Sequence, residues 1–452
     1  MFKNFSKFYF LGIGGISMSA LALILQSKGC EVKGSDERLS SITDGLLQTG
    51  IEVVQGGCAE FVCWADCIVC TSAIADDNDD LLLAKKLGKK VISRAQLLGE
   101  ISADKRAISI AGTHGKTTTT GMISSILLQA HLDPTIHIGG ILKNIGGNLR
   151  IGEGEHFITE ACEYKDAFLS LSNHISVVLN IENDHLDYFK NFDNICSSFN
   201  KFIKNTAKNG LIVYNFDNCC EKLDKNILKQ HNCISFGLTK EGDLRAENIK
   251  ESLQGISFEV VYYSQNLGEV FVPCVGRHNV YNALASIGVG LWLGIDFAVV
   301  KQGLKNYMGV ERRMDIVSVS PYIIHDYAHH PQEIEATLGA ISKSGFEKKI
   351  CIFQPHTFSR TRALYSQFLN CFSSCDEVWL LPIYPAREKP IKGVTSFNLY
   401  KDLRKNRIKA RYFASFSRCY DEIIKNSDKN FMYAILGAGD IEGLAKMFAP
   451  QD

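Results

Sequence analysis

Short apolar runs alternate with longer segments of mixed polarity along the whole chain. The runs are rich in β-branched and aromatic residues and are bounded by glycines or polar residues, which is typical of strands. They lie at residues 8–11, 31–36, 67–70, 107–110, 157–160, 322–326, 350–353, 377–381 and 433–437. Segments whose apolar residues have helical spacing separate them. Examples are the segment that follows the glycines near residue 14 and ends at residue 26, and the segment of residues 283–293. This alternation predicts an α/β fold with mostly parallel sheets.

The order of these elements divides the 452 residues into three predicted domains. Residues 1–102 open with a strand, a glycine turn, a helix and a second strand, which is a Rossmann-like beginning. Residues 103–310 form a central domain that starts with a phosphate loop and is strand-rich from residue 211 to residue 272. Residues 311–452 again alternate strands with helices, so the C-terminal domain is also predicted to be Rossmann-like.

The most specific motif follows the apolar run at residues 107–110. It comprises Gly112, Thr113, His114, Gly115, Lys116, Thr117 and Thr118. Glycines let backbone N–H groups approach phosphate oxygens, the lysine reaches the outer phosphates, and a threonine hydroxyl binds magnesium. The strict pattern has a glycine five residues before Gly115, where this chain has Ile110. This variant phosphate loop predicts a protein that uses ATP or GTP.

A second glycine turn follows the first predicted strand. Gly12 and Gly14 occupy the first two glycine positions of a dinucleotide-binding turn, and Ser17 stands at the third. Asp36 ends the next strand, about where a ribose-binding acid is expected. The strand at residues 67–70 leads into a loop at the edge where open sheets bind ligands. The turn predicts a nucleotide site but does not say which nucleotide.

Polar side chains follow two strands of the central domain. Glu160 ends the strand at residues 157–160, and a carboxylate there can bind the magnesium that a nucleotide carries. The alternative is a helix N-cap. His185 follows another strand in a cluster with Asn180 and Asp184, which favours a metal or nucleotide contact over a purely structural hydrogen bond.

The C-terminal domain carries two further clusters. Residues 326–331 place an acid, a tyrosine and two histidines before a helix that starts with proline. A zinc pair of His325 and His329 lacks further ligands at suitable spacing. Arg360 and Arg362 follow a strand end, and guanidinium groups bind carboxylates or phosphates bidentately. Solvated surface arginines are the alternative for either residue.

Composition excludes several classes of protein. Lys+Arg and Asp+Glu both number 49, so no nucleic-acid or acidic-membrane partner is expected. The longest apolar stretches are too short to span a bilayer. The N-terminus lacks a small-residue cleavage site, so we expect a strand there and not a signal peptide. The 15 cysteines then indicate reduced thiols and a cytoplasmic protein.

Taken together, these motifs resemble the Mur ligase family of peptidoglycan synthesis. The segments that carry the resemblance are Gly-Ile-Gly-Gly-Ile-Ser-Met (12–18), Gly-Thr-His-Gly-Lys-Thr-Thr (112–118), Glu-Ala-Cys-Glu-Tyr (160–164), residues 180–187, His-Asn-Val-Tyr-Asn (278–282), Asp-Tyr-Ala-His-His-Pro (326–331), Tyr-Pro-Ala-Arg-Glu (384–388) and Gly-Ala-Gly-Asp-Ile (437–441). They follow one another along nearly the whole chain. The resemblance implies that the first domain binds the UDP part of a substrate, the second binds ATP, and the third brings an amino acid.

The resemblance also implies a reaction and roles for single residues. With ATP and Mg²⁺, the protein would join L-alanine to the carboxylate of UDP-N-acetylmuramate through an acyl phosphate. Lys116, Glu160 and His185 would be catalytic, and Thr117, Glu160 and His185 would hold metal. The other implied contacts are Gly12, Gly14, Gly15, Ser17, Asp36, Ser72 and Ala73 for the UDP-sugar, Asn279 and Asn282 for ATP together with the phosphate loop, and Tyr327, His329, His356 and Arg360 for the amino acid.

Two positions depart from the family pattern. His325 stands where an acid often precedes Asp326, and Thr357 stands where some members have a basic residue, so amino-acid binding would depend more on Arg360. Three alternatives fit parts of the sequence: another ligase of the same family, either for a later step or for recycling muropeptides onto UDP-muramate, a nicotinamide-dependent oxidoreductase, and a non-catalytic nucleotide-binding regulator. The oxidoreductase leaves the phosphate loop unexplained, and the dense polar clusters disfavour the regulator. Neither an oligomeric state nor a metal-related role for Lys201 follows from the sequence.

Overall fold

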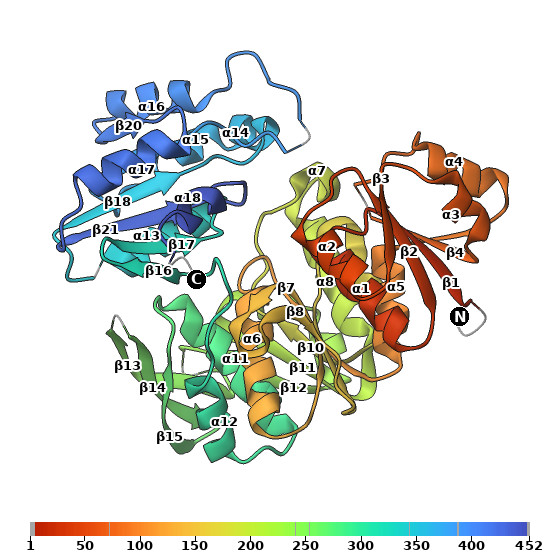
Figure 1. Cartoon of the computed structure of the whole chain (residues 1–452). Helices are drawn as coiled ribbons and strands as arrows, with labels where there is room; N and C mark the ends of the chain where they lie inside the picture. The colour runs from red at the N-terminus through yellow and green to blue at the C-terminus, as the bar shows by residue number, and fades with distance from the viewer. Residues whose placement is uncertain are drawn as a thin grey trace. The chain divides into compact units, whose positions relative to one another are not determined.

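The computed structural model describes residues 5–449, with the exception of Ser72, Lys240, Leu253, Lys343 and Arg387 and of the Asp187 side chain. Among these residues the strands form three sheets in which parallel pairs predominate (Figure 1). The prediction of an α/β fold is confirmed. The chain divides into two compact units, one of Met1–Glu247, Glu259–Val270 and Tyr281–Met308, the other of Asn248–Phe258, Phe271–Val280 and Gly309–Asp452.

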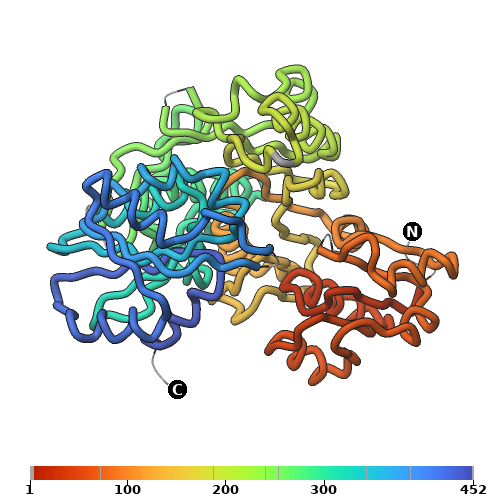
Figure 2. Tube along the Cα trace, turned by 90° about the horizontal axis from the view of Figure 1, so that it is seen from above, coloured from red at the N-terminus to blue at the C-terminus, as the bar shows by residue number. Residues whose placement is uncertain are grey.

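The N-terminal sheet is parallel, with the strand order β3-β2-β1-β4-β5 of a Rossmann-like domain. Its elements are β1 (Lys7–Leu11), α1 (Ile16–Ser27), β2 (Glu31–Asp36), α2 (Ser41–Gln48), β3 (Glu52–Gln55), α3 (Ala59–Trp64), β4 (Cys67–Cys70), α4 (Asp79–Lys86), β5 (Lys90–Ser93) and α5 (Arg94–Ala103). The red and orange trace of Figure 2 shows these residues gathered in one body.

Strand β1 shows why helices cover both faces of this sheet. Phe8 and Phe10 belong to one buried cluster, whereas Tyr9 and Leu11 belong to another, which includes Phe61 of α3. Because successive side chains of a strand point to opposite faces, an unbroken apolar run needs cover on both sides. Figure 1 shows α1, α2 and α5 on one side of the sheet and α3 and α4 on the other.

The central sheet has the strand order β15-β14-β13-β12-β11-β10-β6-β9-β7-β8. Its strands are β6 (Arg106–Ala111), β7 (Thr135–Leu142), β8 (Gly147–Arg150), β9 (His156–Glu160), β10 (Asn173–Val178), β11 (Thr206–Asn215), β12 (Asn232–Gly237), β13 (Leu244–Ser252), β14 (Gly255–Tyr262) and β15 (Gln265–Val272). Its helices are α6 (Lys116–Gln129), η2 (Lys143–Ile145), η3 (Tyr164–Ser170), α7 (Leu186–Phe189), α8 (Phe192–Lys204), α9 (Phe216–Cys219), α10 (Lys225–Lys229), α11 (His278–Trp292) and α12 (Phe297–Lys305). The predicted strand-rich part is confirmed by β11 to β15. Because β6 lies inside the sheet, between β10 and β9, the phosphate loop follows a strand that is buried from Ala107 to Ala111.

The C-terminal sheet has the strand order β16-β17-β21-β18-β19-β20 and is parallel except for the pair β16 and β17. Its elements are β16 (Asp315–Val319), β17 (Tyr322–Asp326), α13 (Pro331–Ser342), β18 (Lys348–Phe353), α14 (Phe358–Ala363), α15 (Tyr365–Phe368), β19 (Glu377–Leu380), α16 (Ser396–Lys405), β20 (Ala410–Tyr412), α17 (Phe416–Lys425), β21 (Phe431–Leu436) and α18 (Glu442–Lys446). Side chains of β18 again alternate between two cores, with Cys351 in one and Ile352 in the other. The predicted Rossmann-like character of this region is confirmed.

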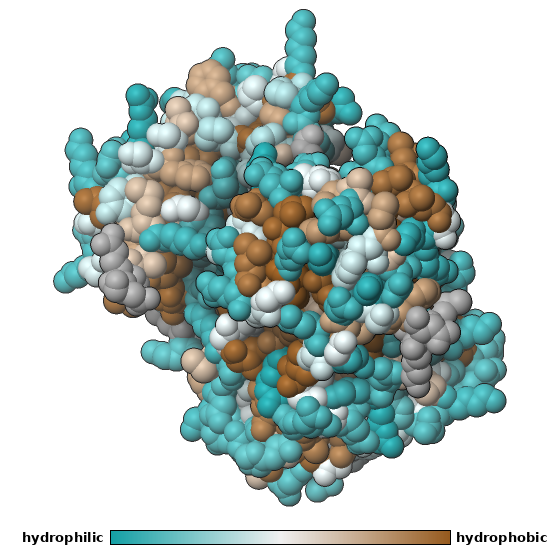
Figure 3. Space-filling model, turned by 45° about the vertical axis from the view of Figure 1, so that its right-hand side comes forward, coloured by the Kyte–Doolittle hydropathy of each residue, from teal (hydrophilic) through white to brown (hydrophobic). Residues whose placement is uncertain are grey.

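No helix in the described part of the chain is long and apolar enough to cross a membrane. On the face drawn in Figure 3, hydrophobic residues are interspersed with hydrophilic ones.

Candidate functional site

The phosphate loop leaves β6 and turns directly into α6. Its two glycines have positive φ angles, 146° at Gly112 and 85° at Gly115, which glycine adopts without steric cost. A Cβ atom at Gly115 would lie only 2.5 Å from Asn282 Oδ1, so no side chain fits there. The loop therefore brings backbone N–H groups to the N-terminus of a 14-residue helix, an arrangement that favours an anion.

Asn180 braces this loop from the neighbouring strand end. Its Oδ1 accepts a hydrogen bond from the His114 N–H (2.8 Å), and its Nδ2 donates to the His114 carbonyl (3.0 Å). Its own carbonyl accepts from the Thr113 N–H (3.2 Å). Part of the polar cluster after β10 thus holds the phosphate loop in shape.

Lys116 is held by a carboxylate that sequence reasoning missed. Its Nζ donates to the carbonyls of Gly112 (2.5 Å) and Thr113 (3.1 Å) and to both carboxylate oxygens of Glu163 (3.1 and 3.0 Å). Burial, the largest single influence, would lower the pKa of Lys116, but the charge and hydrogen bonds of Glu163 together with the nearby Cys162 and Glu160 raise this pKa. An ammonium has three N–H donors. A phosphate oxygen can therefore bind Lys116 only in exchange for one of these partners.

Glu160 and Thr117 lie at the same edge of the central sheet. Strands β6 and β9 are adjacent and parallel, and Ile110 is in register with Glu160. Thr117 follows in the first turn of α6. Glu160 Oε1 accepts a hydrogen bond from the Gly139 N–H at 2.7 Å. Carboxylate and hydroxyl oxygens at one strand edge are the ligand type that Mg²⁺ prefers.

His185 caps the short helix α7 with a left-handed backbone, at φ 53° and ψ 36°. This conformation is uncommon for a residue other than glycine. The imidazole ring packs against Tyr164, with 4.7 Å between ring centroids, and its Nε2 lies 3.7 Å from Asp184 Oδ2. Strained backbone conformations of this kind occur preferentially at functional sites, where the surrounding structure holds them in place.

The glycine turn after β1 is braced by its own acid. Gly12 has a φ of 82°, and a Cβ atom there would lie 2.8 Å from Thr71 Cγ2. The Gly14 N–H donates to Asp36 Oδ2 at 3.0 Å. Asp36, expected to contact a ribose, thus uses one oxygen to shape the turn. Gly15 is the N-cap of α1 and has no side chain to occupy the helix N-terminus.

A cation reaches this turn from α5. Ser17 Oγ accepts a hydrogen bond from Arg94 Nη1 at 3.0 Å. Arg94 begins α5 directly after β5, so it lies at the carboxyl edge of the parallel sheet. Arg94 was missed, because no strand was predicted at residues 90–93 and nothing in the chain order pairs this arginine with residue 17. Ala73 lies in the loop after β4, and Ser72 lies outside the described residues.

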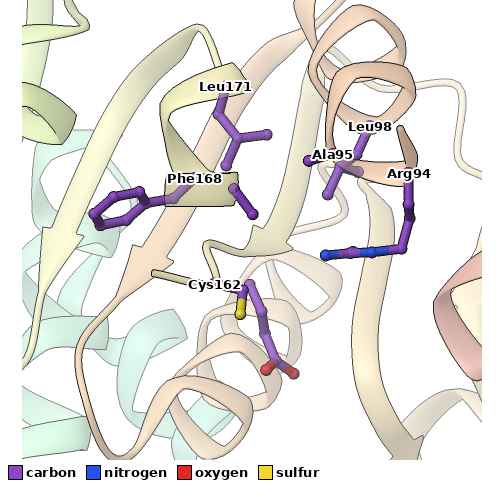
Figure 4. Close-up of a pocket in the computed structure, with 8 residues that line it drawn as sticks. Arg94, Ala95, Leu98, Cys162, Phe168 and Leu171 are labelled. Atoms are coloured by element: carbon purple, nitrogen blue, oxygen red, sulfur yellow. The ribbon is translucent and has the colours of Figure 1, made fainter. Parts of the chain in front are cut away.

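Arg94 also borders a small cavity beside Glu160. Figure 4 shows Arg94 extending from α5 toward the side where Cys162 lies. The remaining lining is mostly apolar and consists of Ala95, Leu98, Ala167, Phe168 and Leu171. The cavity places a guanidinium, a thiol and a carboxylate around one apolar space.

The predicted amino-acid-binding residues of the C-terminal domain come together. Arg360 Nη1 lies 3.2 Å from His356 Nδ1, and the rings of His356 and His329 have centroids 6.0 Å apart. The Tyr327 ring centroid lies 5.4 Å from that of His329. Burial first, then the charge of Arg360, lowers the pKa of His356 to about 4. The cluster therefore combines neutral imidazole with a permanent cation, which suits a carboxylate.

Two arginines of this cluster were missed. The guanidinium carbons of Arg312 and Arg313 lie 4.8 and 5.1 Å from the centroid of the Tyr327 ring. Arg312 Nη1 also donates to Glu442 Oε2 at 3.1 Å. Both arginines precede β16, far in sequence from residues 356–360. Only the sheet topology brings them together.

Asn279 and Asn282 belong to the first turns of α11 and are both buried. Asn279 Nδ2 donates to the Val275 carbonyl at 2.8 Å. Asn282 lies against Gly115 of the phosphate loop. A nucleotide contact of Asn282 is therefore compatible with its position beside the loop.

The fold and the phosphate loop define the class: an α/β protein with a nucleoside-triphosphate loop and two Rossmann-like sheets. Family models match almost all of it. The model described as the Mur ligase family, catalytic domain, matches residues 7–106, the Mur ligase middle domain matches 110–290, and the Mur ligase, glutamate ligase domain, matches 312–439. The chain belongs to the Mur ligase family.

Relatives and solved structures agree with this membership. Two curated proteins named UDP-N-acetylmuramate–L-alanine ligase, from Caldicellulosiruptor saccharolyticus and Clostridium botulinum (strain Okra), are each 42% identical to this chain. The first alignment covers 96% of both chains and the second 97% of this chain and 96% of the relative. The structure of UDP-N-acetylmuramate-alanine ligase MurC from Thermotoga maritima has a TM-score of 0.83, 28% identity and 98% coverage of both chains. A murein peptide ligase from Psychrobacter arcticus shares the fold, with a TM-score of 0.71, 22% identity and 98% coverage of both chains.

Proposed function

We propose that this protein joins L-alanine to the carboxylate of UDP-N-acetylmuramate, with ATP as the energy source, in the synthesis of peptidoglycan precursors. The observation that carries the proposal is the 42% identity, over nearly the full length, to curated enzymes named for this reaction. The phosphate loop with Lys116 supplies the chemistry that such a ligase needs. Family membership leaves the nicotinamide-dependent oxidoreductase without support.

The reaction has two steps that the residues can serve. A carboxylate oxygen of the muramoyl group attacks the γ-phosphorus of ATP, the bond to the β,γ-bridging oxygen breaks, and ADP leaves. The amine of L-alanine then attacks the carbonyl carbon of the acyl phosphate, phosphate leaves with the bonding electron pair, and the nitrogen loses a proton to solvent as the amide forms. Lys116 would neutralise charge on the transferred phosphoryl group while the loop N–H groups hold it in line.

The donor set fits Mg²⁺. Thr117 and Glu160 would hold one ion from the strand edge that they share, and His185 would contribute to a second. Among the described residues, no three His, Cys, Asp or Glu side chains group as a metal cage. Magnesium sites commonly use one or two protein ligands together with water and substrate phosphates. The metal, when bound, would screen the carboxylate from the triphosphate.

The proposed contacts with the UDP-sugar, the adenine of ATP and L-alanine come from different parts of the chain. The UDP-sugar would lie along the turn of Gly12, Gly14, Gly15 and Ser17, and the adenine end of ATP would meet Asn279 and Asn282. Arg360 would bind the carboxylate of L-alanine, with Tyr327, His329 and His356 around it. We further propose domain boundaries at residues 1–102, 103–310 and 311–452. Because ATP and UDP-linked precursors are its substrates, we place the reaction in the cytoplasm.

Phosphate release tests the proposal. Purified protein is mixed with ATP, Mg²⁺ and UDP-N-acetylmuramate, and either L-alanine or the tripeptide of muropeptide recycling is added. We expect L-alanine to stimulate phosphate release and to yield the amide product by mass spectrometry. If only the tripeptide stimulates phosphate release, the protein is the recycling ligase instead. Turnover without Mg²⁺ would contradict the proposed metal sites.

A further inference from the structure

His137 of β7 connects the central sheet to Ser17, which follows the glycine turn after β1. We call this turn, residues 12–15, the sugar turn. Its side chain is almost completely buried, and the residue is 4% exposed. Nε2 lies 2.9 Å from Ser17 Oγ, and Nδ1 lies 2.9 Å from Thr159 Oγ1. Arg94 donates to the Ser17 hydroxyl, and the Thr159 hydroxyl donates to the Glu160 carbonyl at 3.3 Å. A hydrogen-bonded chain thus runs from Arg94 to the main chain of Glu160.

One tautomer of His137 satisfies the whole chain. With its hydrogen on Nδ1, the ring donates to Thr159, whose own hydrogen remains available for the Glu160 carbonyl. Nε2 then accepts from Ser17, whose oxygen remains available for Arg94. Burial first, then the charge of Arg94, lowers the pKa of His137 to about 4, so the ring is neutral and can accept.

The partner of His137 is also the residue that departs from the glycine pattern. Ser17 stands where the turn is expected to have a third glycine. Ser17 is partly buried, and while its oxygen accepts from Arg94 its hydroxyl hydrogen can still use an acceptor as a hydrogen-bond partner. His137 supplies that partner from another sheet, and Ser17 in turn fixes one N–H of Arg94. The serine and the histidine therefore form one functional pair.

We propose that His137 is a positioning residue for the sugar nucleotide. It holds Ser17, and through Ser17 it aims the Arg94 guanidinium at an oxyanion of the substrate, either the diphosphate or the muramoyl carboxylate. This inference rests on the proposed function, since it assumes that the turn after β1 binds a UDP-sugar. Guanidinium groups recognise both oxyanions through the same paired N–H donors.

The test compares variants of His137 with a matched buried histidine. In His137→Leu the acceptor of the Ser17 hydroxyl is lost while Arg94 can still donate to Ser17, and in His137→Gln the amide still reaches the position of Nε2. In His137→Asn the amide reaches only the position of Nδ1. His156, 2% exposed at the start of β9, reports the general cost of altering a buried histidine in this sheet.

We expect His137→Leu to raise the KM for UDP-N-acetylmuramate about tenfold, which is the loss of about one hydrogen bond. The KM for ATP and kcat at saturation should stay within about twofold. His137→Gln should restore the sugar KM, His137→Asn should not, and His156→Gln should leave it unchanged. Ser17→Gly combined with His137→Leu should cost no more than either change alone, because the two residues act as a pair.

Calorimetric binding of UDP-N-acetylmuramate and UDP-N-acetylglucosamine to the same variants identifies the oxyanion. If the variants lose affinity for both ligands equally, Arg94 binds the diphosphate. If they lose affinity only for UDP-N-acetylmuramate, Arg94 binds the muramoyl carboxylate. The inference is overturned if His137→Leu binds both ligands like the wild type. It is also overturned if the KM values for ATP and sugar rise in parallel, or if Asn restores binding and Gln does not. A wild type that binds the sugar but does not ligate L-alanine would refute the proposed function and leave this comparison intact.

Discussion

The chain contains two glycine turns that look alike in sequence and differ in what surrounds them. Each turn follows the first strand of its sheet in chain order, and that strand is parallel to both of its neighbours; each turn also opens a helix. The turn at residues 112–115 ends in Lys116, whose ammonium lies inside the loop. Residues 12–15 include no cationic side chain, and the guanidinium that contacts Ser17 beside this turn belongs to Arg94, the first residue of α5.

The two turns also differ in the side chains that hydrogen-bond to their backbone. Asn180 holds the phosphate loop through its uncharged amide group, and the carboxylate that contacts Lys116 is that of Glu163. Asp36 holds the sugar turn with a carboxylate on the Gly14 amide. Glycine spacing thus determines how closely a ligand can approach the backbone. The charges that reach the turn from elsewhere in the fold decide which anion can bind and what happens to it.

The largest effect should come from removing the lysine of the first turn. Lys116→Ala should lower kcat by about 10³-fold, because the charge that stabilises the transferred phosphoryl group is lost. Binding of UDP-N-acetylmuramate should be unchanged, since the sugar turn does not use this residue. Phosphate release and calorimetry measure the two quantities. Near-normal turnover would refute the role of Lys116.

A matched pair of glycine substitutions should separate the two turns. A Cβ atom at Gly115 would meet Asn282 Oδ1 at 2.5 Å, and one at Gly14 would meet Asp36 Oδ2 at 2.9 Å. Such overpacking typically costs about 1–3 kcal/mol. Gly115→Ala should therefore raise the KM for ATP about tenfold or more, and Gly14→Ala should do the same for the sugar nucleotide. If either variant raises both KM values equally, the turns are not independent sites.

Glu163 should have a smaller effect with a distinct pH signature. Its charge raises the pKa of Lys116, so Glu163→Gln should lower that pKa and move the alkaline limb of the pH–rate profile to lower pH. We expect kcat to fall about tenfold as the ammonium loses its anchor. Rate measurements from neutral to alkaline pH test this expectation. An alkaline limb that stays in place would separate Glu163 from Lys116.

The smallest effect concerns stability beside the sugar turn. Burial first, then the charge of Arg94, lowers the pKa of His137 from its ordinary value of 6.5 to about 4. A depressed histidine pKa stabilises the fold above the unfolded pKa, and this contribution is lost as the pH falls from about 6.5 toward 4. Between pH 7 and pH 5.5 the loss should be about 1 kcal/mol. Denaturant titration should show that His137→Leu removes this part of the pH dependence, whereas an unchanged slope would contradict it.

Much of the fold and part of the candidate site could be predicted from local sequence. Strand β17 was predicted with the bounds that the structure has, because its apolar run follows Pro321 and ends at the polar residues His325 and Asp326. The glycine turns and the first strand ends were also recognisable, since each depends on a few consecutive residues. The predicted roles of the individual site residues remain proposals.

The residues that were missed depend on register and topology. Glu163 pairs with Lys116 only because the segment after β9 runs beside the loop after β6. His137 meets Ser17 across 120 positions of sequence, and Arg312 reaches Tyr327 from a different strand end. No periodicity or spacing encodes such pairs, because strand order is decided by packing of the whole sheet. When the strand order is unknown, the sequence therefore identifies the chemically active residues more readily than the residues that position them.

The most direct test of the account follows the oxygen atoms of the reaction. UDP-N-acetylmuramate with ¹⁸O in its carboxyl group is incubated with ATP, L-alanine and the wild-type protein, and the released phosphate is analysed by mass spectrometry. The account predicts one ¹⁸O atom in each phosphate, because the carboxylate oxygen that attacks the γ-phosphorus leaves with it. Unlabelled phosphate, or release of pyrophosphate with AMP, would contradict activation of the carboxylate at the loop of Lys116.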